Sequence, residues 1–228
     1  MKIASWNVNS LRVRLEHVMD WLVSNDPDVL GLQETKVVDD QFPLEVFTEK
    51  GYHVSFAGQK TYNGVAVISK MPLSDVVVDF PGFEDIQRRV IAVSVGDYRV
   101  LNCYVPNGSD VGSEKYAYKL RWLKALQAYL VSQLKQHEKV IVMGDFNIAP
   151  EDRDVYDPAT WQDKILCSDL EREALQRILD LGFQDSFRLF DQEKDLFSWW
   201  GYRTMAFRRN RGLRIDLMLT SEALSAKC

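Results

Sequence analysis

Short apolar runs alternate with amphipathic stretches from one end of the chain to the other. Runs of this length, bounded by polar or turn-forming residues, are typical of β-strands. They predict strands at residues 2–8, 29–33, 64–69, 90–95, 98–104, 140–144 and 215–220. The pair Gly96 and Asp97 lies between two of these runs and predicts a hairpin turn.

Three longer stretches carry apolar residues at helical spacing. The apolar positions are Leu15, Val18, Met19 and Leu22, then Leu123, Leu126, Leu130 and Leu134, then Leu170, Ala174, Ile178 and Leu181. Asp26 and Pro27 predict the end of the first helix. Ser168 and Glu171 predict a capping box at the start of the third, and Gly182 suits its C-terminal cap. Hairpin and crossover signals together favour an α/β fold with mixed sheets and helices outside.

The composition is that of an ordinary globular protein, with 46% hydrophobic and 27% charged residues in a chain of 228. No linker, repeat or low-complexity segment interrupts it, and we expect a single domain over residues 1–228. The three cysteines are scattered and show no metal-ligand spacing, as expected of reduced thiols in a cytoplasmic protein. We also expect no signal peptide and no membrane contact.

The net charge is −5 and the isoelectric point is about 5.3. These values argue against a protein that binds nucleic acid through its bulk charge. They leave open an enzyme whose local basic rim surrounds a site of carboxylates, since such a site makes the average more acidic by itself.

Polar residues follow several of the predicted strands. They are Asn7, Glu34, Asp145, Asn147 and Asp216. Strand ends are where α/β proteins place their ligands. Carboxylates and asparagine supply the hard oxygen donors that Mg²⁺ or Mn²⁺ prefers. Each residue alone is more often a turn or cap residue, and only their joint pattern favours a metal-dependent site.

Six short motifs occur in an order that resembles the exonuclease III family of the endonuclease/exonuclease/phosphatase superfamily. They are SWNVN at 5–9, LQETK at 32–36, NGVA at 63–66, YVPN at 104–107, GDFN at 144–147 and GLRID at 212–216. The resemblance extends from Met1 to about Ser221. It implies a four-layered sandwich in which helices flank two packed mixed β-sheets.

The same resemblance implies a metal centre. Glu34 matches the main metal ligand, and Asn7 lies beside it in the family pattern. Asp145 matches the residue that orients or deprotonates the attacking water, and with Asn147 it belongs to the metal surroundings. A bound Mg²⁺ or Mn²⁺ would neutralise charge on the phosphate and on the leaving oxygen.

Further positions match contacts to the reacting phosphate. Tyr104 and Asn147 match donors to the phosphate or transition state, and Asn107 is expected to contact the same phosphate. Neutral donors of this type stabilise the charge that develops during hydrolysis. Asp216 matches the acidic residue that supports the histidine of the family site.

The aromatic and basic segments FSWWGYR at 197–203 and FRRNR at 207–211 resemble the family loop that receives an abasic sugar. Trp199, Leu213 and Ile215 match the lining of that pocket, whose apolar walls favour a deoxyribose without a base. The competing interpretation is that these aromatics belong to the core. Cationic side chains that could meet DNA phosphates are Arg12, Lys36 and Arg211, with Lys60, Arg88 and Arg89 as weaker candidates.

One element of the family pattern is missing from this sequence. The family pattern closes with a Ser-Asp-His motif, whereas this chain ends at Cys228 soon after Asp216. His17, His53 and His137 lie outside the matching motifs, and we expect all three to be solvated surface residues. We therefore expect the native chain to continue beyond Cys228.

These features favour a monomeric DNA-repair hydrolase. We expect it to use Mg²⁺ or Mn²⁺ to cut double-stranded DNA 5′ to abasic sites and to degrade or unblock 3′ ends. Two alternatives stay open at this point. One is another phosphodiesterase of the superfamily, and the other is a DNA-binding member that has lost its chemistry.

Overall fold

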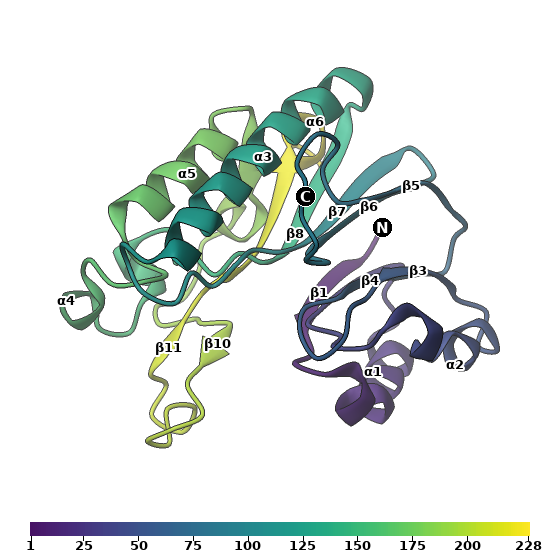
Figure 1. Ribbon diagram of the computed structural model, residues 1–228, viewed down its shortest axis with the longest axis horizontal. Coiled ribbons are helices and arrows are strands. Elements are labelled where there is room, and N and C mark those ends of the chain that lie inside the picture. The colour runs from purple at the N-terminus through teal and green to yellow at the C-terminus, as the bar shows by residue number, and fades with distance from the viewer. The chain divides into compact units, whose positions relative to one another are not determined.

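The computed structural model describes all residues from Met1 to Cys228 and contains two compact units (Figure 1). The first unit comprises Met1–Tyr104 and His137–Asp145, and the second comprises Val105–Gln136 and Phe146–Cys228. The single domain expected from the sequence stays a prediction.

The first sheet of the first unit has the strand order β1-β2-β4-β3. Strands β1 (Ile3–Asn7) and β2 (Val29–Gln33) run parallel, and the helix α1 (Leu11–Asn25) connects them. Strand β4 (Val65–Ser69) is antiparallel to both β2 and β3 (His53–Ala57). Because β1 and β2 are parallel and in register, Asn7 and Gln33 are paired at their carboxyl ends.

Helix α1 buries one apolar face. Leu11, Val18 and Leu22 are fully buried in a core cluster that also contains Phe47 of α2 (Leu44–Thr48). The helix ends where Asp26 adopts a left-handed conformation with φ of 49°, which confirms the predicted stop. A short 3₁₀ helix, η1 (Asp39–Gln41), precedes α2.

The second sheet of the first unit contains β5 (Leu73–Val78), β6 (Val90–Val95), β7 (Tyr98–Tyr104) and β8 (Lys139–Asp145), in that order. The predicted hairpin at Gly96 joins the antiparallel strands β6 and β7. Strands β7 and β8 are parallel, so Tyr104 and Asp145 are paired at their carboxyl ends. This pairing puts two predicted site residues at one edge of the sheet.

The two sheets of the first unit pack face to face through a small polar core. The Asn102 amide donates to the carbonyls of Leu32 (2.8 Å) and Ala66 (2.9 Å), and its oxygen accepts from Gln33 Nε2 (2.6 Å). At Gly31 a Cβ atom would lie 2.9 Å from both Cγ and Oδ1 of Asn102, so a larger residue would displace this hydrogen-bonded amide. The buried bonds fix the strand that leads into Glu34.

The second unit has a helical part and two small strand pairs. Helices α3 (Glu114–Gln136) and α5 (Asp169–Leu179) pack against each other. Strand β9 (Phe183–Asp185) pairs antiparallel with β12 (Asp216–Ser221), and β10 (Trp199–Trp200) pairs with β11 (Gly212–Leu213). The remaining elements are short: η2 (Asp152–Asp154), α4 (Pro158–Trp161), η3 (Ser186–Leu189) and α6 (Glu222–Ser225).

A buried ionic network connects these short elements. Arg214 Nε lies 2.6 Å from Asp154 Oδ1, and Arg214 Nη2 lies 2.7 Å from Asp185 Oδ2. Arg188 also pairs with Asp154, which is fully buried. A buried carboxylate is tolerated only when paired in this way. The network therefore fixes the segment that leads from β11 into Asp216.

The predicted α/β class with two packed mixed sheets and flanking helices is confirmed. All seven predicted strands are present with shifts of a residue at some ends, and the capping box of Ser168 and Glu171 is formed. The third helix differs in detail, because Leu170 is half exposed and Leu181 lies beyond its end. No helix has the length and apolar character needed to span a membrane. None of the three cysteines forms a disulfide.

Candidate active site

Three of the predicted site residues meet where β1, β2 and β8 end. Asn7 Nδ2 donates to Glu34 Oε1 at 2.9 Å and to Asp145 Oδ2 at 2.8 Å. One amide therefore holds two carboxylates from different sheets of the first unit. We refer to Asn7, Glu34, Tyr104 and Asp145 as the carboxylate cluster.

Tyr104 completes this cluster. Its hydroxyl donates a hydrogen bond to Glu34. Burial, together with the charges of Glu34 and Asp145, raises the pKa of the Tyr104 hydroxyl far above its usual range. The Arg89 guanidinium lies 4.8 Å from the centroid of the ring and restricts its position. Tyr104 is therefore a protonated donor at every physiological pH.

Glu34 is an anion at neutral pH. Burial acts to raise its pKa, but hydrogen bonds from Asn7 and Lys36 and the charge of Lys36 hold the pKa below its usual value. The Lys36 ammonium lies 2.9 Å from Glu34 Oε2 and also donates to Asn9. Lys36 is thus attached to the cluster itself.

The turn that carries Glu34 has an unusual backbone. Glu34 and Lys36 have φ of 53° and 55°, in the left-handed region that non-glycine residues rarely occupy. Backbone bonds hold the turn, since the Thr35 amide donates to Gly64 (3.1 Å) and the Lys36 amide donates to Asn63 (2.9 Å). At Gly64 a Cβ atom would lie 2.2 Å from Thr35 Oγ1. The motif at 63–66 therefore supports the conformation of Glu34.

The donor set of the carboxylate cluster fits a hard divalent cation. Mg²⁺ is usually bound through one or two carboxylates, with water and phosphate oxygens completing the shell. Glu34 and Asp145 can supply the carboxylates. No group of three or more Asp, Glu, His or Cys side chains gathers as in a metal cage made of protein alone. Asn7 turns its nitrogen towards the carboxylates, while its oxygen accepts from the Asn9 amide at 3.0 Å, so ligation by Asn7 stays a prediction.

Two asparagine side chains are hydrogen-bonded to each other in the second unit. Asn107 Nδ2 donates to Asn147 Oδ1 at 3.1 Å, and Asn147 Nδ2 donates to the Val105 carbonyl at 3.0 Å. Asn147 is buried and has φ of 50°, whereas Asn107 is exposed. We refer to Asn107 and Asn147 as the asparagine pair.

Asp216 is the first residue of β12 and is half buried. The amides of Ile215 and Asp216 both donate to Ser198 Oγ at 3.0 Å, which connects β12 to the segment before β10. Burial raises the pKa of Asp216 to about 6, although a hydrogen bond to Ser198 opposes this shift. The Phe146 amide donates to the Ile215 carbonyl at 2.9 Å. This backbone bond connects the chain just before Asp216 to the chain just before Asn147.

The histidines lie on the first unit. His17 and His53 are exposed, as expected. His137 is partly exposed, and burial with the nearby Arg99 charge lowers its pKa. None of the three joins the carboxylate cluster by a hydrogen bond or ion pair.

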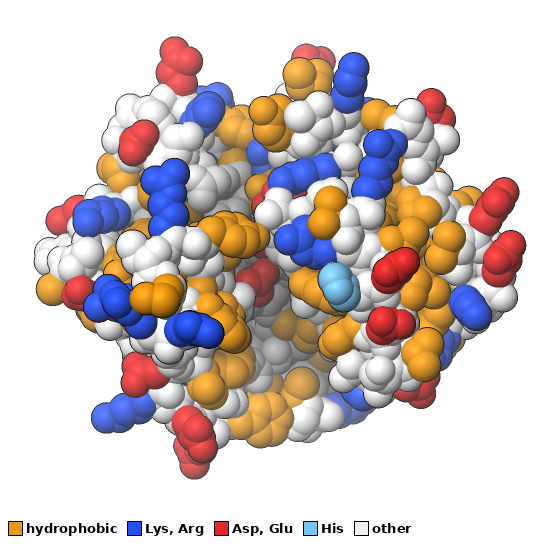
Figure 2. Space-filling model, turned by 90° about the horizontal axis from the view of Figure 1, so that it is seen from below, with side chains coloured by type: hydrophobic (Ala, Val, Ile, Leu, Met, Phe, Trp, Pro, Cys, Tyr) orange, Lys and Arg blue, Asp and Glu red, His pale blue; other side chains and the backbone are white.

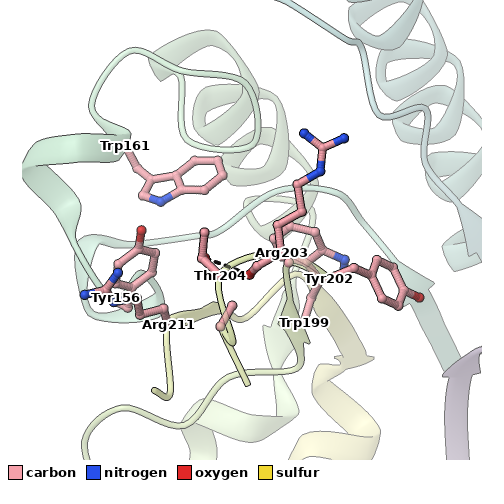
Figure 3. Close-up of a pocket in the computed structure, with 9 residues that line it drawn as sticks. Tyr156, Trp161, Trp199, Tyr202, Arg203, Thr204 and Arg211 are labelled. Carbon is pink, nitrogen blue, oxygen red and sulfur yellow. Dashed lines mark hydrogen bonds between the residues drawn. The ribbon is translucent and has the colours of Figure 1, made fainter. Parts of the chain in front are cut away.

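A pocket of about 350 Å³ lies beside Trp199 in the second unit (Figure 3). Trp199, Arg203 and Arg211 reach it from the β10–β11 hairpin, whereas Tyr156 and Trp161 reach it from the segment after the asparagine pair. Its other lining residues are Gly201, Tyr202, Thr204 and Ala206. The Trp161 indole nitrogen is buried and has no hydrogen-bond partner. We refer to this site as the aromatic pocket.

Two residues predicted to line a lesion pocket are buried instead in the core beneath Trp199. Leu213 is 0% exposed and Ile215 is 2% exposed, and both belong to a cluster against which Trp199, Tyr156 and Trp161 pack. Their contact with DNA stays a prediction. Tyr156 and Trp161 are not predictable from the sequence, because no local motif distinguishes them from ordinary loop and helix residues.

The predicted phosphate contacts differ in setting. Arg12 is exposed and bonds to Gln41, Lys36 pairs with Glu34 of the carboxylate cluster, and Arg211 lines the aromatic pocket. Three further arginines of the hairpin, Arg203, Arg208 and Arg209, are exposed. Figure 2 shows positive and negative side chains interspersed over the visible face. The net negative charge therefore coexists with a locally basic hairpin.

Two carboxylates oriented by one amide, with a protonated tyrosine beside them, are groups that can support the chemistry of one class of enzyme, the metal-assisted phosphodiester hydrolases. The comparisons agree with this class. The Endonuclease/Exonuclease/phosphatase family matches residues 4–228. The chain is 39% identical to exodeoxyribonuclease III of Haemophilus influenzae over 241 aligned residues, which cover 100% of this chain and 90% of that protein.

Solved structures show the same relationship. The 3′-phosphatase NExo from Neisseria, bound to a product DNA hairpin, superimposes with a TM-score of 0.98 at 46% identity, covering 99% of this chain and 88% of that one. An AP endonuclease from Archaeoglobus fulgidus gives 0.95 at 38% identity, with coverage of 99% and 88%. The chain belongs to the exonuclease III family of DNA-repair nucleases within the endonuclease/exonuclease/phosphatase superfamily.

Proposed function

We propose that this protein hydrolyses phosphodiesters of double-stranded DNA with Mg²⁺ or Mn²⁺, cutting 5′ to abasic sites and removing nucleotides or blocking groups from 3′ ends. We further propose that it acts as a cytoplasmic monomer. The observation that carries the proposal is the carboxylate cluster, in which Asn7 holds Glu34 and Asp145 together at hydrogen-bond distance.

Each member of the cluster has a task in hydrolysis. A bound divalent cation supplies Lewis-acid stabilisation of the phosphate oxygens and of the leaving alkoxide. Glu34, held as an anion, and Asp145 would bind it. Asp145 also accepts the proton of the attacking water, a contribution that is typically worth about 10²–10⁴-fold. Tyr104 keeps its proton, and its single O–H group would turn from Glu34 to donate a hydrogen bond to the developing charge on the phosphate.

The resemblance to the family assigns the asparagine pair to the phosphate as well. Asn107 follows Tyr104 by three residues, and Asn147 follows Asp145 by two. Carboxamides donate hydrogen bonds without titrating, so they stabilise an anionic phosphate equally at every physiological pH. We therefore assign the pair to binding of the phosphate, with hydrogen bonds that are stronger in the transition state than in the ground state.

The aromatic pocket supports selection of damaged DNA. Its aromatic side chains offer flat apolar surfaces, and Arg203 and Arg211 add positive charge. Extruding a nucleotide from a duplex costs a few kcal/mol, and the cost is least where base pairing is already lost. An abasic nucleotide is therefore extruded more easily than an intact one.

A second candidate function is removal of phosphate from 3′ ends. It is favoured by the 46% identity to the Neisseria 3′-phosphatase, which is higher than the 38% identity to the archaeal AP endonuclease. The two activities use the same phosphoryl chemistry and differ in what lies beside the phosphate. A non-catalytic DNA-binding role is disfavoured by the intact carboxylate cluster, which binding alone does not require.

The test compares four substrates in one preparation: a duplex with a single abasic analogue, a duplex with a 3′-phosphate, an undamaged duplex and a phosphoinositide. We expect Mg²⁺-dependent cleavage of the first two, slower digestion of the third and none of the fourth. Chelation with EDTA should abolish all cleavage. Equal rates on abasic and undamaged duplexes would overturn the lesion preference, and hydrolysis of the phosphoinositide alone would overturn the DNA assignment.

A further inference from the structure

A fully buried ion pair lies in the second unit. Lys119 of α3 and Glu171 of α5 are both 0% exposed, and the Lys119 ammonium pairs with Glu171 Oε1. Lysine is among the residues that are almost never fully buried, and apolar side chains of similar volume are often as stabilising as a buried ion pair. Stability alone therefore gives little reason for a charge at this position.

The Lys119 ammonium is bonded to both members of the asparagine pair. It donates to the main-chain carbonyl of Asn147 at 2.7 Å and to that of Asn107 at 3.2 Å. With Glu171 as the third partner, these bonds match the three donors of an ammonium group. A single cation thus joins the two loops that carry the asparagine side chains.

Glu171 fixes the position of this cation. Its Oε1 also accepts from the Leu166 amide (3.1 Å), and its Oε2 accepts from the Ser168 amide (3.1 Å) and hydroxyl (2.6 Å). Charge-assisted bonds of this kind are short and strong. Both oxygens of the Glu171 carboxylate are hydrogen-bonded at the start of α5, so this carboxylate is fixed. It therefore holds the Lys119 ammonium at one position.

The asparagine pair needs such support. Asn147 has φ of 50°, a conformation that persists only when the surroundings impose it. Gly108 follows Asn107 with φ of +93°, and a Cβ atom there would lie 3.2 Å from Lys119 Cδ. The loop is therefore shaped to let the lysine side chain reach both carbonyls.

We propose that Lys119, held by Glu171, is a positioning residue that sets the two carboxamides of the asparagine pair for the phosphate without touching the substrate. The proposal rests on the proposed function, because that function assigns the pair to phosphate binding. A displacement of about 1 Å in a positioned group can cost about 10²-fold in rate. The asparagine side chains need this accuracy, since their hydrogen bonds are directional.

The test is a double-mutant cycle of Lys119→Met with Asn147→Ala, measured on abasic duplex. We expect Lys119→Met to lower kcat by at least about 10-fold with little change in KM, as for an interaction made in the transition state. In the Asn147→Ala background most of this loss should disappear, because coupled residues are not additive. Lys119→Arg should recover part of kcat, since guanidinium can donate to the same carbonyls.

Loss of stability is separated from loss of position by Ile178→Ala. Ile178 is fully buried on α5 and bonds to neither asparagine, so this variant should lower the unfolding temperature and leave kcat nearly unchanged. If Lys119→Met does not fold, Glu171→Gln replaces it in the cycle. The proposal is overturned if the losses of Lys119 and Asn147 multiply independently. It is also overturned if a variant of Ile178 with the same loss of stability loses the same activity.

A readout without catalysis keeps this inference distinct from the proposed function. The side-chain amide resonances of Asn107 and Asn147 should shift or broaden in Lys119→Met and stay in place in Ile178→Ala. Unchanged resonances in Lys119→Met would reject the positioning role even in an active enzyme. An inactive wild-type enzyme whose resonances respond as expected would reject the proposed function and leave the positioning role in place.

Discussion

The carboxylate cluster and the aromatic pocket are built in opposite ways. The cluster lies at the ends of buried strands, and Asp145 is only 5% exposed. The pocket is formed mainly by a hairpin with two-residue strands, and its rim residue Tyr202 is 83% exposed. Each member of the cluster has a bonded partner, whereas the pocket contains an indole nitrogen with no partner.

This difference follows from what each region has to do. Reacting groups must be held within about 0.5 Å of their productive positions, which requires rigid elements and supporting hydrogen bonds. Recognition tolerates a more mobile setting, and binding residues are often carried on loops above a rigid scaffold. We therefore expect changes in the cluster to affect every substrate and changes in the pocket to affect substrate choice.

The largest effect is expected from Glu34→Gln. The substitution keeps the shape but removes the charge that would bind the metal, so turnover on all DNA substrates should fall by at least about 100-fold. The Mg²⁺ concentration needed for half-maximal cleavage should rise. Glu49→Gln, an exposed carboxylate of the same unit, is the matched control and should behave as wild type. Wild-type rates and metal dependence in Glu34→Gln would remove Glu34 from the metal site.

A smaller and selective effect is expected from Trp199→Ala. Stacking on an aromatic side chain is worth about 1–3 kcal/mol, so abasic-site cleavage should fall by about 10-fold or more. Cleavage at an ordinary 3′ end should fall less. Phe207→Ala removes an exposed aromatic of the same hairpin and serves as control. If Trp199→Ala lowers both activities equally, Trp199 is a core residue and does not read the lesion.

A still smaller effect is expected from Arg12→Ala. Losing one phosphate contact should weaken binding to all duplex sequences alike and reduce the slope of log K against log salt by about 1. Titrations at several salt concentrations measure this slope. Lys50→Ala, which removes an exposed cation elsewhere on the first unit, should leave it unchanged. A wild-type slope in Arg12→Ala would place Arg12 outside the interface.

The smallest effect concerns stability at Asp216. Its pKa of about 6 in the folded protein exceeds the usual value of 3.8, so the folded state binds the proton more tightly than the unfolded state. This contribution to stability is complete below pH 4 and is lost as the pH rises through 6. Asp216→Asn has no carboxyl group to titrate at this position. Between pH 4 and pH 7 the unfolding temperature of wild type should therefore fall relative to that of Asp216→Asn. If the unfolding temperatures of the two proteins changed in parallel with pH, burial would not raise the pKa of Asp216.

The strands that carry the site could be predicted from the sequence because they are continuous apolar runs. The sequence does not predict strands β3 and β5, because β5 is largely exposed and β3 includes the polar residues His53 and Ser55. Strands β10 and β11 have two residues each, which is too short for any periodicity. The sequence could therefore predict the scaffold better than the hairpin that borders the pocket.

The sequence also predicts only part of the candidate site. Glu34 and Asp145 were recognised through strand ends and motif resemblance, and the structure brings them together through Asn7. Nothing local marks Lys119, Tyr156 or Trp161, and the capping-box pattern of Glu171 does not reveal its pairing with Lys119, because these contacts join segments far apart in sequence. The burial of Leu213 and Ile215 was not foreseen either, since a motif gives a position but not the depth of a side chain.

If the carboxylate cluster performs the chemistry for every substrate and the aromatic pocket selects among them, the two regions can be separated by one ratio. This is the ratio of kcat/KM for an abasic duplex to that for a 3′-phosphate duplex, measured for wild type, Glu34→Gln and Trp199→Ala. We expect Glu34→Gln to lower both values by at least about 100-fold and keep the ratio, and Trp199→Ala to lower the ratio by about 10-fold. A ratio that changes in Glu34→Gln and stays constant in Trp199→Ala would contradict this expectation.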